Sequence, residues 1–105
     1  MMLKKTKVIC TQGPSTDPEG IVDALIESGM NCARFNFSHG SHEEHLVRIQ
    51  KVRAAAERSG KVISLILDTK GPEMRLGEFA AGKVHLEKGK QFTLTHADTP
   101  GDETH

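Results

Sequence analysis

Two stretches of the sequence combine oxygen-bearing and cationic side chains in patterns that suit ligand binding. In the first, Arg34, Asn36 and Ser38 alternate with two phenylalanines. Alternate side chains of an extended chain share a face, so we expect the three polar groups on one side and the two rings on the other. Because an unpaired charge is costly to bury, Arg34 must meet either a ligand or an acidic side chain at the rim of a sheet.

The second polar stretch follows the next apolar run and begins with Asp68. With Asn36 and Ser38 it offers a carboxylate, an amide oxygen and hydroxyls, which suit a hard cation better than zinc or copper. A single carboxylate leaves both a monovalent cation and Mg²⁺ open. Arg34 and Arg75 would favour phosphate or carboxylate groups. The two stretches therefore predict a combined cation and anion site, suited to a phosphorylated metabolite.

Three of the six histidines, His39, His42 and His45, recur at every third position. This spacing invites a metal hypothesis, but side chains at i, i+3 and i+6 drift around a helix, and no cysteine completes a shell. We therefore disfavour a bound transition metal. His39 alone, at the end of a predicted strand, is the better functional candidate.

The elements that must position these residues alternate along the chain. Apolar runs predict strands at residues 7–11, 31–37 and 62–67, and the third is apolar almost throughout, as a strand covered on both faces should be. A helix is expected between the first two strands, with Asp17 as its N-cap and Gly29 at its end. The order strand, helix, strand, helix, strand predicts a parallel α/β sheet, with Asn36 and Asp68 side by side at its carboxyl edge.

The second helix is expected to begin with a capping box formed by Ser41 and Glu44 and to end at Gly60. Its periodicity predicts one apolar face, made of Leu46, Ile49, Val52 and Ala56.

The pattern changes after Gly71 and Pro72. Residues 83–87 and 91–95 alternate apolar and polar around a Lys-Gly-Lys turn, which predicts an antiparallel hairpin. We therefore predict two domains, residues 1–72 and residues 73–105.

Composition excludes several classes of function. The 105 residues contain 14 basic and 14 acidic side chains, so the net charge is zero. A nucleic-acid binder or a polybasic membrane binder usually carries a basic excess. No apolar span is long enough for a signal or transmembrane segment, and Cys10 and Cys32 form no metal or redox spacing. We expect a cytoplasmic protein with reduced thiols and neither a nucleic-acid nor a membrane partner.

Three blocks of the sequence, residues 5–11, 29–40 and 67–75, resemble the opening of pyruvate kinase in their order and spacing. The run Asn-Phe-Ser-His-Gly followed by Leu-Asp-Thr-Lys-Gly-Pro-Glu is the most specific part. The resemblance implies a TIM-type (β/α)8 barrel with a small antiparallel β domain inserted after the third strand. This chain would supply the first three strands and two helices, because such a barrel needs roughly 250 residues.

The resemblance also implies a reaction: phosphoryl transfer from phosphoenolpyruvate to ADP, giving pyruvate and ATP in glycolysis, with K⁺ and Mg²⁺ as cofactors. Arg34 would contact the phosphoenolpyruvate phosphate. The nucleotide phosphates would be bordered by Asn36, Phe37, Ser38, His39 and Arg75. The implied K⁺ ligands are Asn36, Ser38, Asp68 and Thr69, the last through its backbone carbonyl.

The family's catalytic lysine and acidic Mg²⁺ ligands lie on later barrel strands, and the whole enzyme is expected to be a homotetramer. We therefore expect a catalytically inactive N-terminal portion of a pyruvate kinase. The alternative is a non-enzymatic β/α module that binds phosphate or K⁺ and assembles with another chain.

Overall fold

The computed structural model describes residues 4–105, which form two compact units. The first unit extends to Gly71, and the second runs from Pro72 to His105. All named helices and strands of the described residues lie in the first unit.

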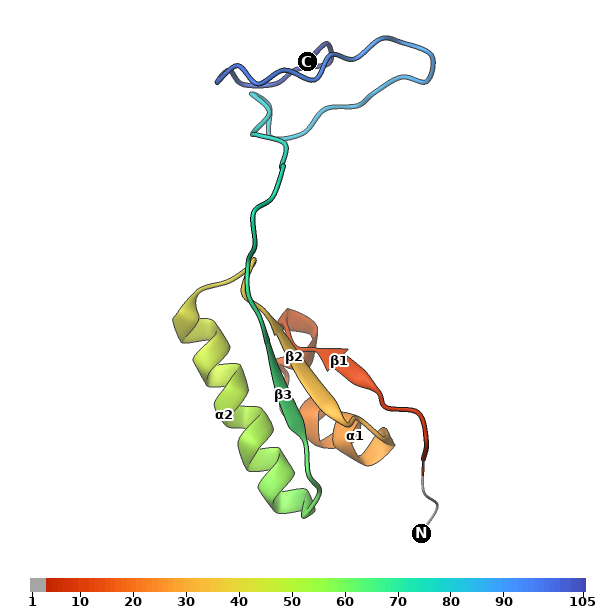
Figure 1. Cartoon of the computed structure of the whole chain (residues 1–105), viewed down its shortest axis with the longest axis vertical. Coiled ribbons are helices and arrows are strands. Elements are labelled where there is room, and N and C mark those ends of the chain that lie inside the picture. The colour runs from red at the N-terminus through yellow and green to blue at the C-terminus, as the bar shows by residue number, and fades with distance from the viewer. Residues whose placement is uncertain (1–3) are drawn as a thin grey trace. The chain divides into compact units, whose positions relative to one another are not determined.

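The first unit is built on a three-stranded parallel sheet. Figure 1 shows β2 (Cys32–Asn36) between β1 (Ile9–Thr11) and β3 (Ser64–Asp68). In the register of β2 and β3, Asn36 is the partner of Asp68. The predicted parallel α/β arrangement is therefore confirmed, and so is the meeting of these two residues at one edge.

The connection after β1 differs from the prediction. A 3₁₀ helix, η1 (Pro14–Thr16), comes first, and α1 (Ile21–Ser28) begins only at Ile21, with Gly20 as its N-cap. Asp17 is therefore not the N-cap, because its carboxylate is engaged elsewhere. The end of α1 is as predicted: Gly29 adopts φ = +115°, a left-handed conformation that glycine reaches without strain.

Helix α2 (His42–Ser59) connects β2 to β3, and its predicted capping box is confirmed. The Glu44 amide donates to the Ser41 hydroxyl and the Ser41 amide donates to the Glu44 carboxylate, both at 3.2 Å. These two bonds satisfy donors that the first turn leaves free. No helix within residues 4–105 is both long and apolar enough to cross a membrane.

The core lies between the helices and one face of the sheet. Its buried members come from both helices, from β2 and from the link between α1 and β2: Val22, Ile26, Met30, Ala33, Phe35, Val52 and Ala55.

The predicted apolar face of α2 was wrong at one position. Leu46 is 53% exposed, whereas the neighbouring His45 is 3% exposed. The buried residues of α2 are His45, Val52 and Ala55, and Ile49 packs against the core. The observed stripe thus keeps Ile49 and Val52 and has His45 in place of Leu46. A histidine in this stripe is invisible to a pattern that counts only apolar residues.

The expectation that β3 is covered on both faces was also wrong for this structure. Ile66 and Leu67 are exposed, although Leu65 packs against the core. In residues 4–105, β3 pairs only with β2, and a parallel sheet buries such strands only where both faces are covered.

The second unit corrects the predicted antiparallel hairpin. The turn forms, since the Lys90 amide donates to the Glu87 carbonyl at 3.2 Å, but residues 83–87 and 91–95 are not paired strands. Instead, Phe79 and Gly101 form an isolated parallel bridge. Two strands alone form only a marginally stable hairpin, because no third strand or helix covers their apolar face.

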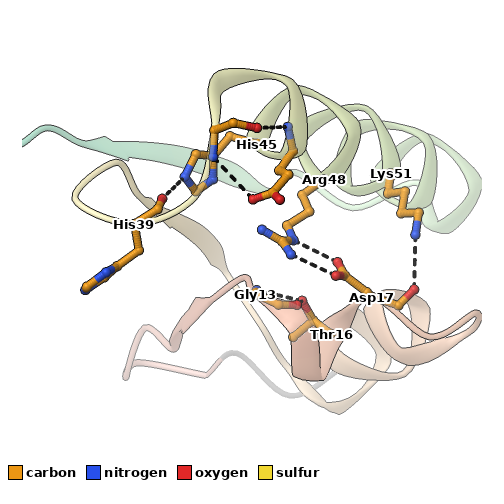
Figure 2. Close-up of polar contacts among 9 residues, drawn as sticks. Gly13, Thr16, Asp17, His39, His45, Arg48 and Lys51 are labelled. Carbon is orange, nitrogen blue, oxygen red and sulfur yellow. Dashed lines mark hydrogen bonds and ion pairs between the residues drawn. The ribbon is translucent and has the colours of Figure 1, made fainter. Parts of the chain in front are cut away.

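A salt bridge ties the loop before α1 to α2 (Figure 2). Arg48 donates to both oxygens of Asp17, from Nε at 2.7 Å and from Nη2 at 2.8 Å. Lys51 Nζ donates to the Asp17 carbonyl at 3.0 Å. The bond from Arg48 holds the pKa of the Asp17 carboxyl below its usual value. This engagement is the physical reason that Asp17 does not cap α1.

The observed buried stripe of α2 gives a stability test. Val52→Ala should lower the free energy of unfolding by about 2 kcal/mol, because the side chain is fully buried and its loss leaves a cavity. Leu46→Ala, the control, should change it by less than about 0.5 kcal/mol. Urea unfolding followed by circular dichroism measures both, and equal effects would contradict the observed face.

The Asp17–Arg48 bridge predicts a pH dependence. A carboxyl whose pKa is lowered in the folded state stabilises above its unfolded pKa of about 3.9 and loses that effect as pH falls through the folded value. Since Asp17 is 40% exposed, Asp17→Asn should cost no more than about 1 kcal/mol at pH 7.

The difference between wild type and Asp17→Asn should shrink at pH 3. Asp23→Asn removes the exposed pair with Arg58 and serves as the matched control. A wild-type advantage over Asp17→Asn that stays the same from pH 7 to pH 3 in urea unfolding would contradict the assignment.

Candidate functional site

The candidate site lies where β2 and β3 end. Arg34, Asn36 and Asp68 share one face of the sheet, because residues two apart on a strand and residues paired in parallel register point the same way. The opposite face carries Ala33 and Phe35, which are fully buried against the helices. The alternation of polar and apolar residues along β2 therefore separates the site from the core.

The central contact of the site joins Arg34 to Asp68. Nε and Nη2 of Arg34 donate to Oδ2 of Asp68 at 2.8 and 2.5 Å, and Nη1 donates to the Thr11 hydroxyl at 3.0 Å. The two charged side chains are 32% and 44% exposed. Arg34 thus has the acidic partner at the sheet rim that the sequence left open, and it still faces solvent. Thr11, which the sequence analysis did not single out, helps to orient the guanidinium.

The loop after β2 folds back on Asn36. The side-chain oxygen of Asn36 accepts from the Ser38 amide at 3.0 Å, and its carbonyl accepts from the His39 amide at 3.2 Å. The Phe37 amide donates to the Asp68 carbonyl at 2.9 Å, which carries the pairing of the strands one residue further. The structure thus brings the predicted residues 36–38 to the edge where Asp68 lies.

Two predicted site residues lie outside this cluster of contacts. Thr69 directly follows β3 and is exposed. Arg75 belongs to the second unit, where its Nε donates to the Glu73 carboxylate at 2.7 Å, and this bond raises the pKa of the guanidinium. The predicted roles of both residues remain predictions.

The donor set at this edge fits a hard monovalent cation. It consists of amide, hydroxyl and carboxylate oxygens, and the one carboxylate is already paired with a guanidinium. Both contacts from Arg34 end on Oδ2, so Oδ1 of Asp68 can accept a further ligand. Among residues 4–105, no group of three or more histidine, cysteine, aspartate or glutamate side chains gathers as a metal site. The cluster on its own therefore fits Mg²⁺ less well.

His45 is a residue beside the site that the sequence analysis considered only as part of the histidine spacing. Figure 2 shows its ring directed at the backbone carbonyl of His39, with Nε2 2.6 Å from that oxygen. The imidazole of His39 points away from this contact. The signal that could have found His45 is its place one turn before Ile49 and two before Val52, on the buried stripe of α2.

The two cysteines take no part in the site. Both are free; Cys32 is buried and Cys10 is half-buried. Burial raises the pKa of the Cys32 thiol, and the neighbouring Cys10 adds to this effect. A thiol with a raised pKa is less reactive, in keeping with a structural residue.

Comparisons with known proteins agree on one family. Residues 3–105 match the family described as pyruvate kinase, barrel domain. The pyruvate kinase of Staphylococcus haemolyticus is 48% identical over 99 residues, which make up 94% of this chain and 17% of that enzyme. The pyruvate kinase of Staphylococcus aureus is 44% identical over the same coverage. This chain therefore spans about a sixth of the length of these curated relatives.

Solved structures give the same result. A pyruvate kinase from Cryptosporidium parvum matches 94% of this chain and 21% of its own, with 40% identity and a TM-score of 0.72. The Cryptosporidium parvum pyruvate kinase in complex with ADP matches 95% of this chain and 20% of its own, with 41% identity and a TM-score of 0.76. The chain belongs to the pyruvate kinase family and corresponds to an N-terminal portion of its barrel domain.

Proposed function

We propose that this chain supplies the phosphate-binding and K⁺-binding corner of a pyruvate kinase, which transfers a phosphoryl group from phosphoenolpyruvate to ADP. The observation that carries the proposal is the pairing of Arg34 with Asp68 beside Asn36. It gathers an anion-binding and a cation-binding group at the carboxyl edge of a parallel sheet, where such folds bind their ligands.

Arg34 is suited to hold the phosphate of phosphoenolpyruvate. A guanidinium has five N–H donors, and three of them bind Asp68 and Thr11, so two remain for an anion. The three occupied donors fix the plane of the group before the substrate arrives. Such preorganised positive charge stabilises a transferring phosphoryl group without reorganisation during the reaction.

The oxygen ligands beside Arg34 would hold K⁺. Asn36, Ser38 and Asp68 would bind it with their side chains, and Thr69 with its carbonyl. When bound, K⁺ adds positive charge near the transferred phosphoryl group. Arg34 keeps the carboxylate of Asp68 oriented, so the protein's own part is to hold both charges in fixed positions.

We assign the nucleotide phosphates to the loop after β2, from Asn36 to His39, together with Arg75. The support is the bend that the loop makes through its bonds to Asn36 and the ADP complex of the Cryptosporidium parvum relative. Mg²⁺ and the catalytic lysine would be supplied by barrel strands beyond this chain. We expect the complete enzyme to be a cytoplasmic homotetramer.

The first prediction concerns the 105-residue chain by itself. It should show no turnover of phosphoenolpyruvate and ADP above background in an assay coupled to lactate dehydrogenase, because the catalytic lysine and the acidic Mg²⁺ ligands are expected on later barrel strands. Adding the remaining segment of a related pyruvate kinase as a separate chain tests the alternative, a module that assembles with a partner. Activity of the chain alone would refute the prediction that essential catalytic groups lie on later barrel strands.

The second prediction concerns Arg34 in a complete pyruvate kinase that carries this segment. Arg34→Lys keeps the charge but cannot reproduce the planar contacts to Asp68 and Thr11. We expect kcat to fall by about 100-fold, as when a preorganised donor is lost from an active site.

Arg58→Lys is the matched control for this prediction. Arg58 forms an exposed pair with Asp23, and its replacement should leave kcat within about twofold, since such pairs contribute little. Near-normal kcat in a folded Arg34→Lys enzyme would contradict the role assigned to Arg34.

A further inference from the structure

We propose that His45 is a positioning residue that sets the conformation of the loop between β2 and α2, residues 37–40. This inference rests on the proposed function of the loop, which is to border the nucleotide phosphates. His45 is a member of the first turn of α2 and is 3% exposed, so it acts on the loop from the helix side.

A hydrogen bond makes the first connection. Nε2 of His45 lies 2.6 Å from the His39 carbonyl, as Figure 2 shows, and a carbonyl can only accept, so Nε2 carries the proton. The other ring nitrogen, Nδ1, is buried without a hydrogen-bond partner among the described residues. The ring therefore makes its one hydrogen bond to the loop, at the residue that follows Ser38.

Ring stacking makes the second connection. The Phe37 ring lies parallel to the His45 ring, with centroids 4.4 Å apart and an angle of 11° between the planes. Phe37 is the residue before Ser38. His45 thus contacts the loop on both sides of Ser38, while Asn36 accepts hydrogen bonds from the Ser38 and His39 amides.

The close approach of Gly40 shows how tightly the loop meets the helix. Gly40 adopts φ = +77°, and a Cβ placed there would lie 2.9 Å from a carboxylate oxygen of Glu44 and 3.3 Å from Nε2 of His45. Glu44 is itself fixed by the capping box with Ser41. The first turn of α2 is therefore a firm support, and His45 transmits its position to residues 37–39.

Two substitutions separate the two connections. His45→Phe keeps an aromatic ring against Phe37 but removes the donor, which leaves the His39 carbonyl without its partner. His45→Gln keeps a donor nitrogen at similar reach and removes the ring. His42→Phe is the matched control, because His42 is exposed and lies tilted against Phe37 at a centroid distance of 5.6 Å.

Amide hydrogen exchange in the full chain tests the positioning without reference to catalysis. In His45→Phe, the loop loses its partly buried bond from His45 to the His39 carbonyl, so the Ser38 and His39 amides should exchange about tenfold faster. Amides of Ala33 and Phe35 should keep their rates. His45→Gln, which keeps a donor and loses only the stacking, should accelerate the loop amides less than His45→Phe does. Unchanged loop amides, or an equal acceleration along all of β2, would overturn the proposal.

Steady-state kinetics test whether the loop binds the nucleotide. They are measured on a complete pyruvate kinase that carries this segment. In His45→Phe, KM for ADP should rise about tenfold while KM for phosphoenolpyruvate and kcat change less than about twofold. Partial rescue by His45→Gln and no change in His42→Phe are expected. Equal rises in both KM values would overturn the link to the nucleotide. If the complete enzyme carrying the wild-type segment were inactive, the proposed function would be refuted, and hydrogen exchange would still decide the positioning.

Discussion

The parallel register between β2 and β3 decides how Arg34, Asn36 and Asp68 lie relative to one another. It places Asn36 opposite Asp68 and brings Arg34 within reach of the same carboxylate. The Arg34–Asp68 pair itself contributes little to stability, about 0 to 1 kcal/mol for so exposed a bridge. The buried face of β2, with Phe35 and Ala33 against both helices, must therefore hold the register, and the ion pair depends on that core.

In the helices, too, apolar residues form the core while polar residues hold the loops in place. In α2, Val52 and Ala55 bury against the sheet, whereas His45, on the same stripe, turns a polar ring toward the loop. Arg48 binds Asp17, in the loop between β1 and α1. One helix thus packs the core through its apolar members, and through its polar members it holds two loops, the one between β1 and α1 and the one after β2.

The sequence predicted well what depends on local chemistry and on strand order. The capping box at Ser41, the end of α1 at Gly29 and the meeting of Asn36 with Asp68 follow from residue types and from the rules of parallel sheets. The predictions that failed depend on contacts between elements far apart in the sequence. The Asp17 carboxylate binds the guanidinium of Arg48 in α2 and does not cap the nearby N-terminus of α1. The sequence around Asp17 gives no sign of this distant partner.

The burial of His45 and the fate of the predicted hairpin were missed for related reasons. A histidine counts as polar in any periodicity, although a ring with one bonded nitrogen packs as a core side chain. Residues 83–87 and 91–95 alternate as strands do, but pairing also needs a surface against which the apolar face can pack. The spacing of apolar residues indicates which face of a segment could be buried. Whether that face is buried depends on the structure around it.

The face-sharing of Arg34, Asn36 and Asp68 also limits how this stretch of chain can vary in length. A strand repeats every two residues, so a shift of β3 by one position would put Leu67 beside Asn36 and turn Asp68 toward the helices. Insertions or deletions of one residue between Gly60 and Ser64 are therefore unlike ordinary loop changes. They would leave the helices intact and break the Arg34–Asp68 pair. An insertion or deletion of two residues would keep Asp68 on its face, so the number of residues changed must be even.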